Sequence, residues 1–301
     1  MLAKVLIIVG SIIVGFFLLC LLLNIIAFHP PRYNKKKYQG DLHENHLDIA
    51  KYKPFKSGGC KIRAYLYENS NPIGLIIFCH GIGTSSDYYI PEILKWYSLG
   101  YSVYTFDYRG YWTNKGLFKG LVQNVKDLNL AINFINDGKL PITLMGHSLG
   151  GYTVSSVMRL NKSKNIKNIV TISAFSRQLD VLKELYDKLK VPKRIRWFFT
   201  GIIKLGQTVF FGFKWKIESK DVVNEHPEIN YLVFQSINDK DVLPFGAALY
   251  NKKEEINVPN IQYFMFEDKP YDTHMGIIRG GGKGTVNEKL IEIVNSNINK
   301  E

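Results

Sequence analysis

The segment PITLMGHSLGGYTV, residues 141–154, decides how the rest of this chain is interpreted. A short apolar run ends at Met145, the pattern G-x-S-x-G follows over 146–150, and a stretch typical of a helix start begins at Gly151. A strand that turns this sharply into a helix exposes the hydroxyl of Ser148, and side chains in place of the flanking glycines would collide there. The helix N-terminus also offers free N–H groups to developing negative charge. The segment therefore predicts Ser148 as a nucleophile, with a helix N-cap serine as the competing interpretation.

Around this segment, short apolar runs alternate with stretches of helical periodicity. The predicted strands cover 62–67, 74–79, 101–106, 142–145, 166–172, 231–235 and 261–266. The predicted helices cover 91–99, 122–135, a stretch from about 149, and 286–298. This alternation predicts an α/β fold with a mainly parallel sheet covered by helices on both faces. Residues 176–230 interrupt the alternation between two strands, and they are predicted to form an inserted helical cap.

Two further motifs precede the serine segment. FCHGIG (78–83) follows one predicted strand, and DYRGY (107–111) follows the next. Together with G-x-S-x-G they resemble the His-Gly loop, the D-x-R-G-x turn and the nucleophile turn of the α/β-hydrolase superfamily. The resemblance extends over roughly residues 60–300. It includes serine hydrolases similar to lysophospholipases and monoacylglycerol lipases, as well as S33-like serine aminopeptidases. The pattern departs at Trp112, where a small residue is usual, so that loop is expected to differ in shape.

The resemblance implies roles for residues in these loops. In the superfamily, backbone N–H groups of the residue after the nucleophile and of the His-Gly loop stabilise the oxyanion. Carried over to this chain, those residues are Leu149 and Ile82. His80 and His147 lie in the same loops and are predicted to line the substrate pocket without acting as bases.

A serine nucleophile needs a histidine that takes its proton and a carboxylate that orients the histidine. The superfamily's chain order is serine, acid, histidine, which points to Asp239 in the turn after strand 231–235. Asp241 stays open as the acid because the following Val-Pro is one residue late for that alignment. His274, beyond the last strand, is the predicted base, whereas His226 precedes the acid. The competing interpretation is that these are solvated turn and loop residues.

The first part of the chain predicts a membrane helix. Residues 5–28 are 24 residues without a charge, and as a helix they would span about 36 Å, enough for a hydrocarbon core of about 30 Å. A signal peptide usually has a shorter apolar region that ends in small residues, which this run lacks. We therefore expect an uncleaved transmembrane anchor over 1–28, a polar linker over 29–56 and a hydrolase domain over 57–301. Only Lys4 and the amino terminus precede the apolar run, whereas four basic residues follow within 32–37, so the positive-inside rule favours a cytoplasmic catalytic domain.

The composition of the chain limits the classes of partner that it is expected to bind. Lys and Arg number 39 against 26 Asp and Glu, but no nucleic-acid motif accompanies this excess, so nucleic acid is not an expected partner. Three cysteines are too few and too irregularly placed for a disulfide framework or a zinc site, so no metal or cofactor is expected. Residues 194–217 hold seven aromatic and five basic residues and no acid. They predict either a cap that buries its aromatics against the core or a lid that touches anionic lipid.

These patterns predict a membrane-bound serine hydrolase that cleaves an ester or thioester of an apolar acyl substrate through an acyl-enzyme. A proline-type aminopeptidase on the same fold is the alternative enzyme. A catalytically silent membrane scaffold is the alternative from another class of protein. The sequence leaves the acyl length, the leaving group and the oligomeric state open.

Overall fold

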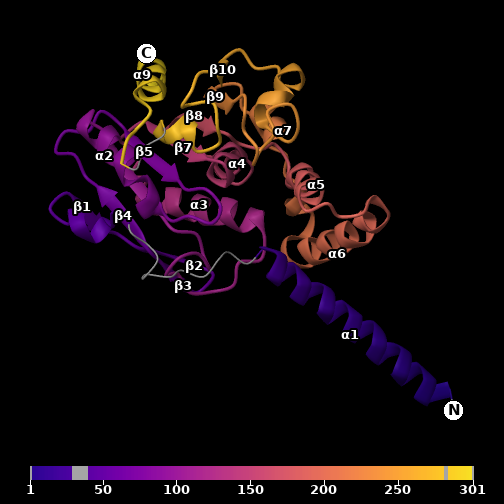
Figure 1. Ribbon diagram of the computed structural model, residues 1–301. Coiled ribbons are helices and arrows are strands. Elements are labelled where there is room, and N and C mark those ends of the chain that lie inside the picture. The colour runs from indigo at the N-terminus through magenta and orange to yellow at the C-terminus, as the bar shows by residue number, and fades with distance from the viewer. Residues whose placement is uncertain (1, 29–39, 281–283, 300–301) are drawn as a thin grey trace.

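The computed structural model describes residues 2–28, 40–280 and 284–299, and a mainly parallel sheet forms the body of this part of the chain (Figure 1). The sheet has eight strands in the order β1-β4-β6-β5-β7-β8-β9-β10. Their bounds are β1 Ala50–Tyr52, β4 Ala64–Tyr67, β5 Leu75–Cys79, β6 Ser102–Phe106, β7 Ile142–His147, β8 Ile166–Ile172, β9 Asn230–Ser236 and β10 Ile261–Phe266. Strands β1, β4 and β6 pair antiparallel, and every pair from β6 to β10 is parallel. The predicted α/β fold class is thereby confirmed.

Alternation along the strands divides the core into two apolar layers. On β5, Leu75, Ile77 and Cys79 pack into one layer, whereas Ile76 and Phe78 pack into the other. The first layer contains residues of α3 (Leu121–Ile135), α4 (Leu149–Ser156) and α7 (Ser219–Asn224). The second contains residues of α2 (Ile90–Ser98), α8 (Gly276–Arg279) and α9 (Glu288–Ile298). Successive side chains of a strand point to opposite faces, so helices cover both faces of the sheet.

The predicted linker, 29–56, is too long. Residues 40–56 contain a 3₁₀ helix, η1 (His43–His46), as well as β1 and the start of a separate two-stranded hairpin of β2 (Phe55–Ser57) and β3 (Cys60–Ile62). The physical reason is burial: β1 pairs with β4, and the His43 ring contacts the Tyr67 hydroxyl at 2.7 Å. Residues 29–39 of the predicted linker lie outside the described residues.

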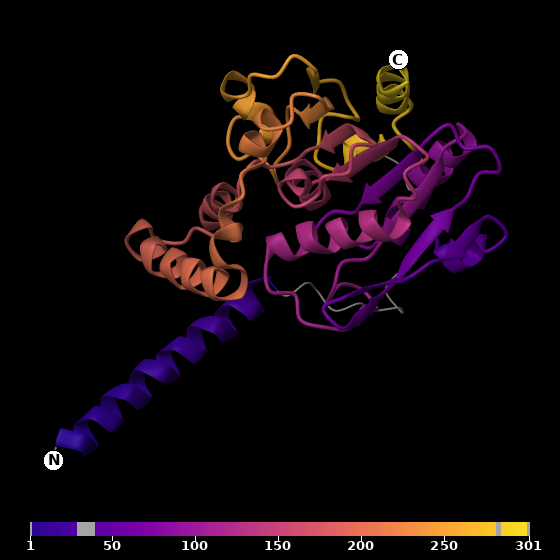
Figure 2. The same cartoon turned by 180° about the vertical axis from the view of Figure 1, so that it is seen from behind.

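The segment predicted as a cap lies between β8 and β9. It contains α5 (Gln178–Lys188), α6 (Lys193–Phe211) and η4 (Gly212–Lys216), followed by α7. Figure 2 shows α5 and α6 standing out from the body, with the long helix α1 (Leu2–Phe28) leaving the molecule beside α6. By contrast α7 packs on α4, where the Ser155 and Ser219 hydroxyls are 2.8 Å apart. The shorter 3₁₀ helices η2 (Ser86–Tyr89), η3 (Val157–Arg159) and η5 (Leu249–Glu255) complete the described elements.

Candidate active site

Ser148 occupies a strained turn between β7 and α4. Its φ of 55° and ψ of −116° lie in a region that residues with side chains rarely adopt. The turn is held because the Ser148 N–H donates to Ile172 O at 2.8 Å. A Cβ on Gly146 would lie 2.3 Å from the carbonyl carbon of Gly150, and one on Gly150 would lie 2.1 Å from Cys79 O, so both positions require glycine. Within the described residues the Ser148 hydroxyl makes no hydrogen bond, and none joins it to His274.

Two backbone N–H groups flank the serine. Leu149 is the first residue of α4, and Ile82 lies in the loop after β5. This loop adjoins the serine, because a Cβ on Gly81 would be 3.5 Å from Ser148 Cβ. Neither the Leu149 nor the Ile82 N–H donates a hydrogen bond within the part of the chain that the structure describes. Unsatisfied N–H groups in such positions can stabilise an oxyanion, the role predicted for these two residues.

Asp239 and His274 form the closest acid–base pair of the predicted site. Asp239 Oδ2 lies 2.7 Å from His274 Nδ1, and the aspartate side chain is fully buried. The carboxylate also accepts hydrogen bonds from Gln235 Nε2 and from the N–H groups of Asp241 and Val242. These bonds fix the carboxylate, and its contact with Nδ1 leaves Nε2 of the imidazole for a proton from the serine.

Asp241, the other carboxylate considered, lies elsewhere. Its Oδ1 pairs with Lys188 Nζ of α5 at 2.7 Å, and both side chains are more than half exposed. It therefore joins the cap to the turn, and within the described residues Asp239, not Asp241, is the carboxylate bonded to His274. His226 is also remote from this pair, since its ring contacts Glu228 on the surface after α7.

Two loops carry Asp239 and His274, and polar contacts hold these loops together. The Ser236 hydroxyl donates to Tyr271 O at 2.8 Å, and the Asn238 side chain donates to Asp272 Oδ2 at 2.8 Å. The Asn238 N–H also donates to Asp272 O. The residues before His274 are thus attached to the turn that carries the acid, which fixes the position of the base.

A family model described as serine aminopeptidase, S33, matches residues 70–227, more than half of the 301 residues. The chain belongs to the serine aminopeptidase S33 family. The motifs quoted for the α/β-hydrolase resemblance fall within or beside the matched range, and that resemblance is confirmed. Membership of this family makes the protein a hydrolase.

Solved structures agree with the fold of this S33-family hydrolase. An esterase from Pyrococcus furiosus is 18% identical, with a TM-score of 0.65 over 90% of this chain and 96% of that chain. An esterase from Exiguobacterium antarcticum is 15% identical, with a TM-score of 0.56 over 83% and 100% of the two chains. A bromoperoxidase from Bacillus anthracis is 16% identical, with a TM-score of 0.54 over 81% and 100%. No curated protein matches the chain in sequence.

His147 and Tyr89 connect the three reactive loops of the hydrolase. His147 Nε2 lies 2.9 Å from the carbonyl oxygen of His274, so this nitrogen must carry the proton. Burial, with His274 nearby, holds the pKa of His147 well below its usual value, so the ring is neutral and its Nδ1 can only accept. The Tyr89 hydroxyl therefore donates to His147 Nδ1 at 2.9 Å, and its oxygen accepts the Gly81 N–H at 3.1 Å. One chain of hydrogen bonds thus runs from the loop after β5 through the Ser148 turn to the loop that carries His274.

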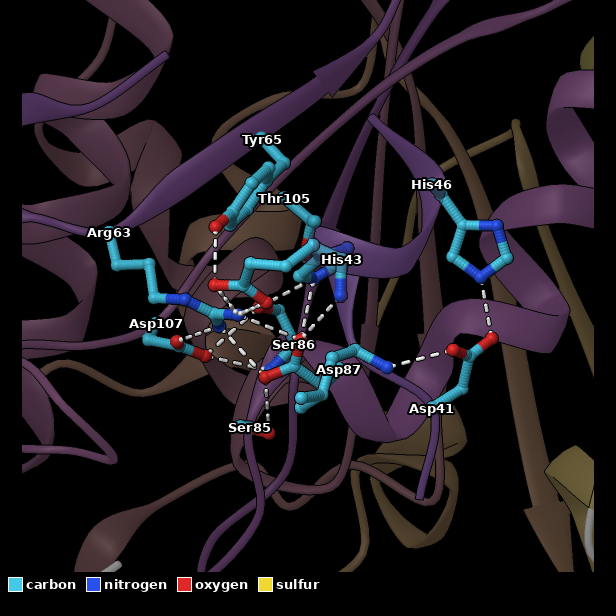
Figure 3. A network of polar contacts seen from close by, with 12 residues as sticks. Asp41, His43, His46, Arg63, Tyr65, Ser85, Ser86, Asp87, Thr105 and Asp107 are labelled. Atoms are coloured by element: carbon cyan, nitrogen blue, oxygen red, sulfur yellow. Dashed lines mark hydrogen bonds and ion pairs between the residues drawn. The ribbon is translucent and has the colours of Figure 1, made fainter. Parts of the chain in front are cut away.

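A buried ionic network supports the loop that carries Ile82 and Tyr89 (Figure 3). Arg63 Nη1 binds both Asp87 and Asp107 at 2.8 Å. Burial alone would lower the pKa of Arg63, but the two carboxylates raise it, so the guanidinium stays charged. Asp107, the first residue of the D-x-R-G motif, also accepts the Ser86 N–H at 2.7 Å. The network therefore attaches η2 to the ends of β4 and β6.

His80 also holds the loop after β5 in place. Its Nδ1 lies 2.8 Å from Gly81 O, and its Nε2 accepts the Tyr108 N–H at 3.3 Å. Burial lowers the pKa of His80, so the ring is neutral with its proton on Nδ1. His80 and His147, both predicted to line the substrate pocket, are fully buried and bonded to protein groups through both ring nitrogens. We assign them to positioning the loops.

The described residues include no cluster of His, Cys, Asp or Glu that could hold a metal ion. Two surface cavities lie away from the serine. One of about 810 Å³ lies beside η1 and β3 and is lined by Arg63, Tyr65 and Trp112, among others. The other, of about 350 Å³, lies in the cap. Neither is lined by Ser148, Asp239 or His274.

The sequence did not single out Tyr89, Arg63 or Gln235. Tyr89 follows the His-Gly loop by only a few residues, and a tyrosine at that distance is the one local signal of its role. Arg63 interrupts an apolar run, and a charge within a predicted strand is a sign of a buried ion pair. Gln235 is the last residue but one of the buried strand β9, which ends directly before the turn of Asp239.

Replacement of the acid tests the orienting contact. We expect Asp239→Asn to lower kcat by about 10⁴-fold, because an amide favours the wrong histidine tautomer. Asp241→Asn is the matched control, since it removes only a surface ion pair worth about 0–1 kcal/mol. Rates of p-nitrophenyl ester hydrolysis by the full-length variants in detergent measure both effects. Equal losses in the two variants would contradict the assignment of Asp239.

Removal of one hydroxyl tests the chain of hydrogen bonds. Tyr89→Phe leaves His147 Nδ1 and the Gly81 N–H without their partner, so we expect kcat to fall about 10- to 100-fold at nearly unchanged KM. Tyr88→Phe is the control, because its ring packs under Arg279. Steady-state kinetics with thermal melting separate positioning from folding. A Tyr89→Phe variant that keeps wild-type kcat would show that the loops hold their geometry without this bond.

Proposed function

We propose that this protein is a serine hydrolase that cleaves an ester or thioester bond of an apolar acyl substrate through an acyl-enzyme intermediate. The observation that carries the proposal is the buried Asp239–His274 pair at 2.7 Å, in a loop bonded to the strained turn of Ser148 through His147. A buried carboxylate against an imidazole is the arrangement that turns a serine hydroxyl into a nucleophile.

The chemistry follows from the positions of these groups. Ser148 Oγ attacks the substrate carbonyl carbon while His274 Nε2 takes the hydroxyl proton, and Asp239 stabilises the resulting imidazolium. The Leu149 and Ile82 N–H groups bind the oxyanion. The imidazolium then gives its proton to the departing alcohol or thiol, which leaves the acyl group on Ser148. A water molecule deprotonated by His274 attacks this ester, and the carboxylic acid leaves as the serine regains its proton.

The charges of the cap favour an acyl substrate over a peptide. An aminopeptidase must bind a free ammonium group, for which carboxylates are the natural partners. The stretch 194–217 has no acid. The acids of α5 are engaged: Asp180 pairs with Arg177, Glu184 accepts the N–H groups of two residues, and Asp187 pairs with Arg196.

An aminopeptidase remains the second candidate, because the family that matches the chain carries that description. The silent-scaffold alternative is disfavoured by the strained Ser148 turn, since backbone strain costs roughly 1–3 kcal/mol and a scaffold would gain nothing from it.

We further propose that α1 anchors the enzyme in the cell membrane as a single span. Residues Ala3–Phe28 are long and apolar enough to cross a membrane, a test that a signal sequence near the N-terminus also passes. Asn24 favours a retained helix: its side chain is buried and donates to Ile202 O of α6 at 2.8 Å. Gln207 Nε2 of α6 in turn donates to Asn24 Oδ1 at 3.2 Å. A removed leader would need no such polar contacts with the cap, and the positive-inside rule favours a cytoplasmic catalytic domain.

A substrate panel tests the proposed reaction. We expect the full-length protein in detergent to hydrolyse p-nitrophenyl esters, with kcat/KM rising with acyl length, and to leave prolyl p-nitroanilide almost untouched. Ser148→Ala should lower ester turnover by about 10⁶-fold, as loss of the nucleophile does in related sites. Faster turnover of the prolyl amide than of every ester would establish the aminopeptidase instead. Ester turnover that survives in Ser148→Ala would remove the nucleophile assignment.

A further inference from the structure

Helix α6 has one apolar face that the protein covers only in part. Its residues recur at intervals of three and four, which places them on one side of the helix. They are Ile195, Phe198, Phe199, Ile202, Leu205, Gly206 and Val209. The buried members, Ile202 and Gly206, lie against α1, since a Cβ on Gly206 would meet the Asn24 side chain at 2.1 Å. The other five are exposed on either side of this contact. The same face of α6 therefore meets α1 at its centre and solvent at its flanks.

Two further aromatics of the cap are more exposed than this face, and one of them, Trp197, borders it because its ring lies 6.0 Å from the ring of Phe198. Trp197 on α6 is 74% exposed, and Phe213 on η4 is 76% exposed. By contrast Phe211 and Trp215 are buried, so they fulfil the role of aromatics that pack against the core. Segment 194–217 thus contains both kinds of aromatic residue: some pack against the core, and others stay at the surface. Trp197, Phe198 and Phe199 stay exposed together on α6, and exposed aromatics grouped in this way mark an interaction surface.

Basic residues border this surface. Lys193, Arg194, Lys204, Lys214 and Lys216 are all exposed. None of them forms an ion pair with a carboxylate of the described residues. Lys216 Nζ lies over the Phe213 ring at 5.1 Å, which places a cation beside the most exposed aromatic. Aromatic rings bordered by unpaired Lys and Arg are the composition of a helix that lies in the interface of an anionic bilayer.

We infer that α6 and η4 dock on the surface of the anionic leaflet from which α1 emerges. The inference rests on the proposed anchoring of the chain by α1. The position of α1 identifies the membrane surface as the partner of this face. α1 meets the apolar face of α6 at Asn24, close to the C-terminal end of α1. The exposed apolar residues on either side of this contact therefore lie where the bilayer surface would be (Figures 1 and 2). The hydrogen bonds of Asn24 to Ile202 and Gln207 fix α6 at this level. The cap then rests at the membrane, where an apolar acyl substrate would be dissolved.

Tryptophan quenching in vesicles tests the docking. The full-length protein is reconstituted into vesicles of phosphatidylglycerol and phosphatidylcholine, with brominated or ordinary acyl chains. Of the four tryptophans, Trp96 and Trp215 are buried and Trp112 lies beside η1. We expect the brominated lipid to quench the wild type, and Trp197→Phe to lose most of that quenching. The matched control Trp112→Phe should keep it. Vesicles of phosphatidylcholine alone, or high salt, should reduce the quenching.

Three results would overturn the inference. Quenching that is the same in the wild type and in Trp197→Phe would show that α6 stays away from the lipid. Quenching independent of lipid charge and salt would show that the basic residues do not select an anionic leaflet. Cross-links between Trp197-bearing segments of two chains, with no quenching, would show that a second copy covers this face. Alkaline extraction tests the anchoring by α1 separately. A protein that stays with the vesicles but shows no Trp197 quenching is anchored without docking. A protein that is extracted lacks the anchor itself.

Discussion

The structure depends on the close approach of the N-terminus of α4 to the carboxyl ends of the central strands. Gly150 passes so near Cys79 O that no side chain fits, and Gly146 has the same constraint against Gly150. This approach holds Ser148 at its positive φ and brings the start of α4 beside the loop after β5. A strained backbone of this kind persists only where the surrounding structure holds it. The two apolar layers of the sheet provide that support.

The reactive loops come from four different strand ends, so their relative positions rely on long-range contacts. Neutral buried histidines provide several of them, because a ring that cannot charge has one fixed donor and one fixed acceptor. His147 joins Tyr89 to the loop that carries His274, and His80 joins the loop after β5 to Tyr108. Below them, Arg63 holds two carboxylates in the core. Such buried charges cost desolvation, and they are kept when their geometry fixes a structure.

Local patterns predicted the parts of the molecule that short segments determine. The strands at 166–172 and 261–266 have the predicted bounds because each is rich in β-branched or aromatic residues and lies between polar loops. The Ser148 turn followed from adjacent glycines. Long-range pairing was harder to predict: residues 50–52 carry little apolar character, and they form a strand because β4 presents an open edge to them. The choice between Asp239 and Asp241 likewise depends on where Lys188 and His274 lie in space. The aromatic residues of the cap either pack on the core or stay exposed, depending on their position around the helix. The number of aromatic residues in a segment does not reveal that position.

Covalent labelling tests the account most directly. A fluorophosphonate reacts when an activated serine oxygen attacks phosphorus and fluoride leaves, so the adduct marks the nucleophile itself. The full-length protein in detergent is labelled, digested and mapped by mass spectrometry, beside His274→Ala and the control His226→Ala. The account predicts one adduct, on Ser148, that forms at the wild-type rate in His226→Ala and at least about 10³-fold more slowly in His274→Ala. An adduct on another residue, or equal labelling rates in the two histidine variants, would contradict it.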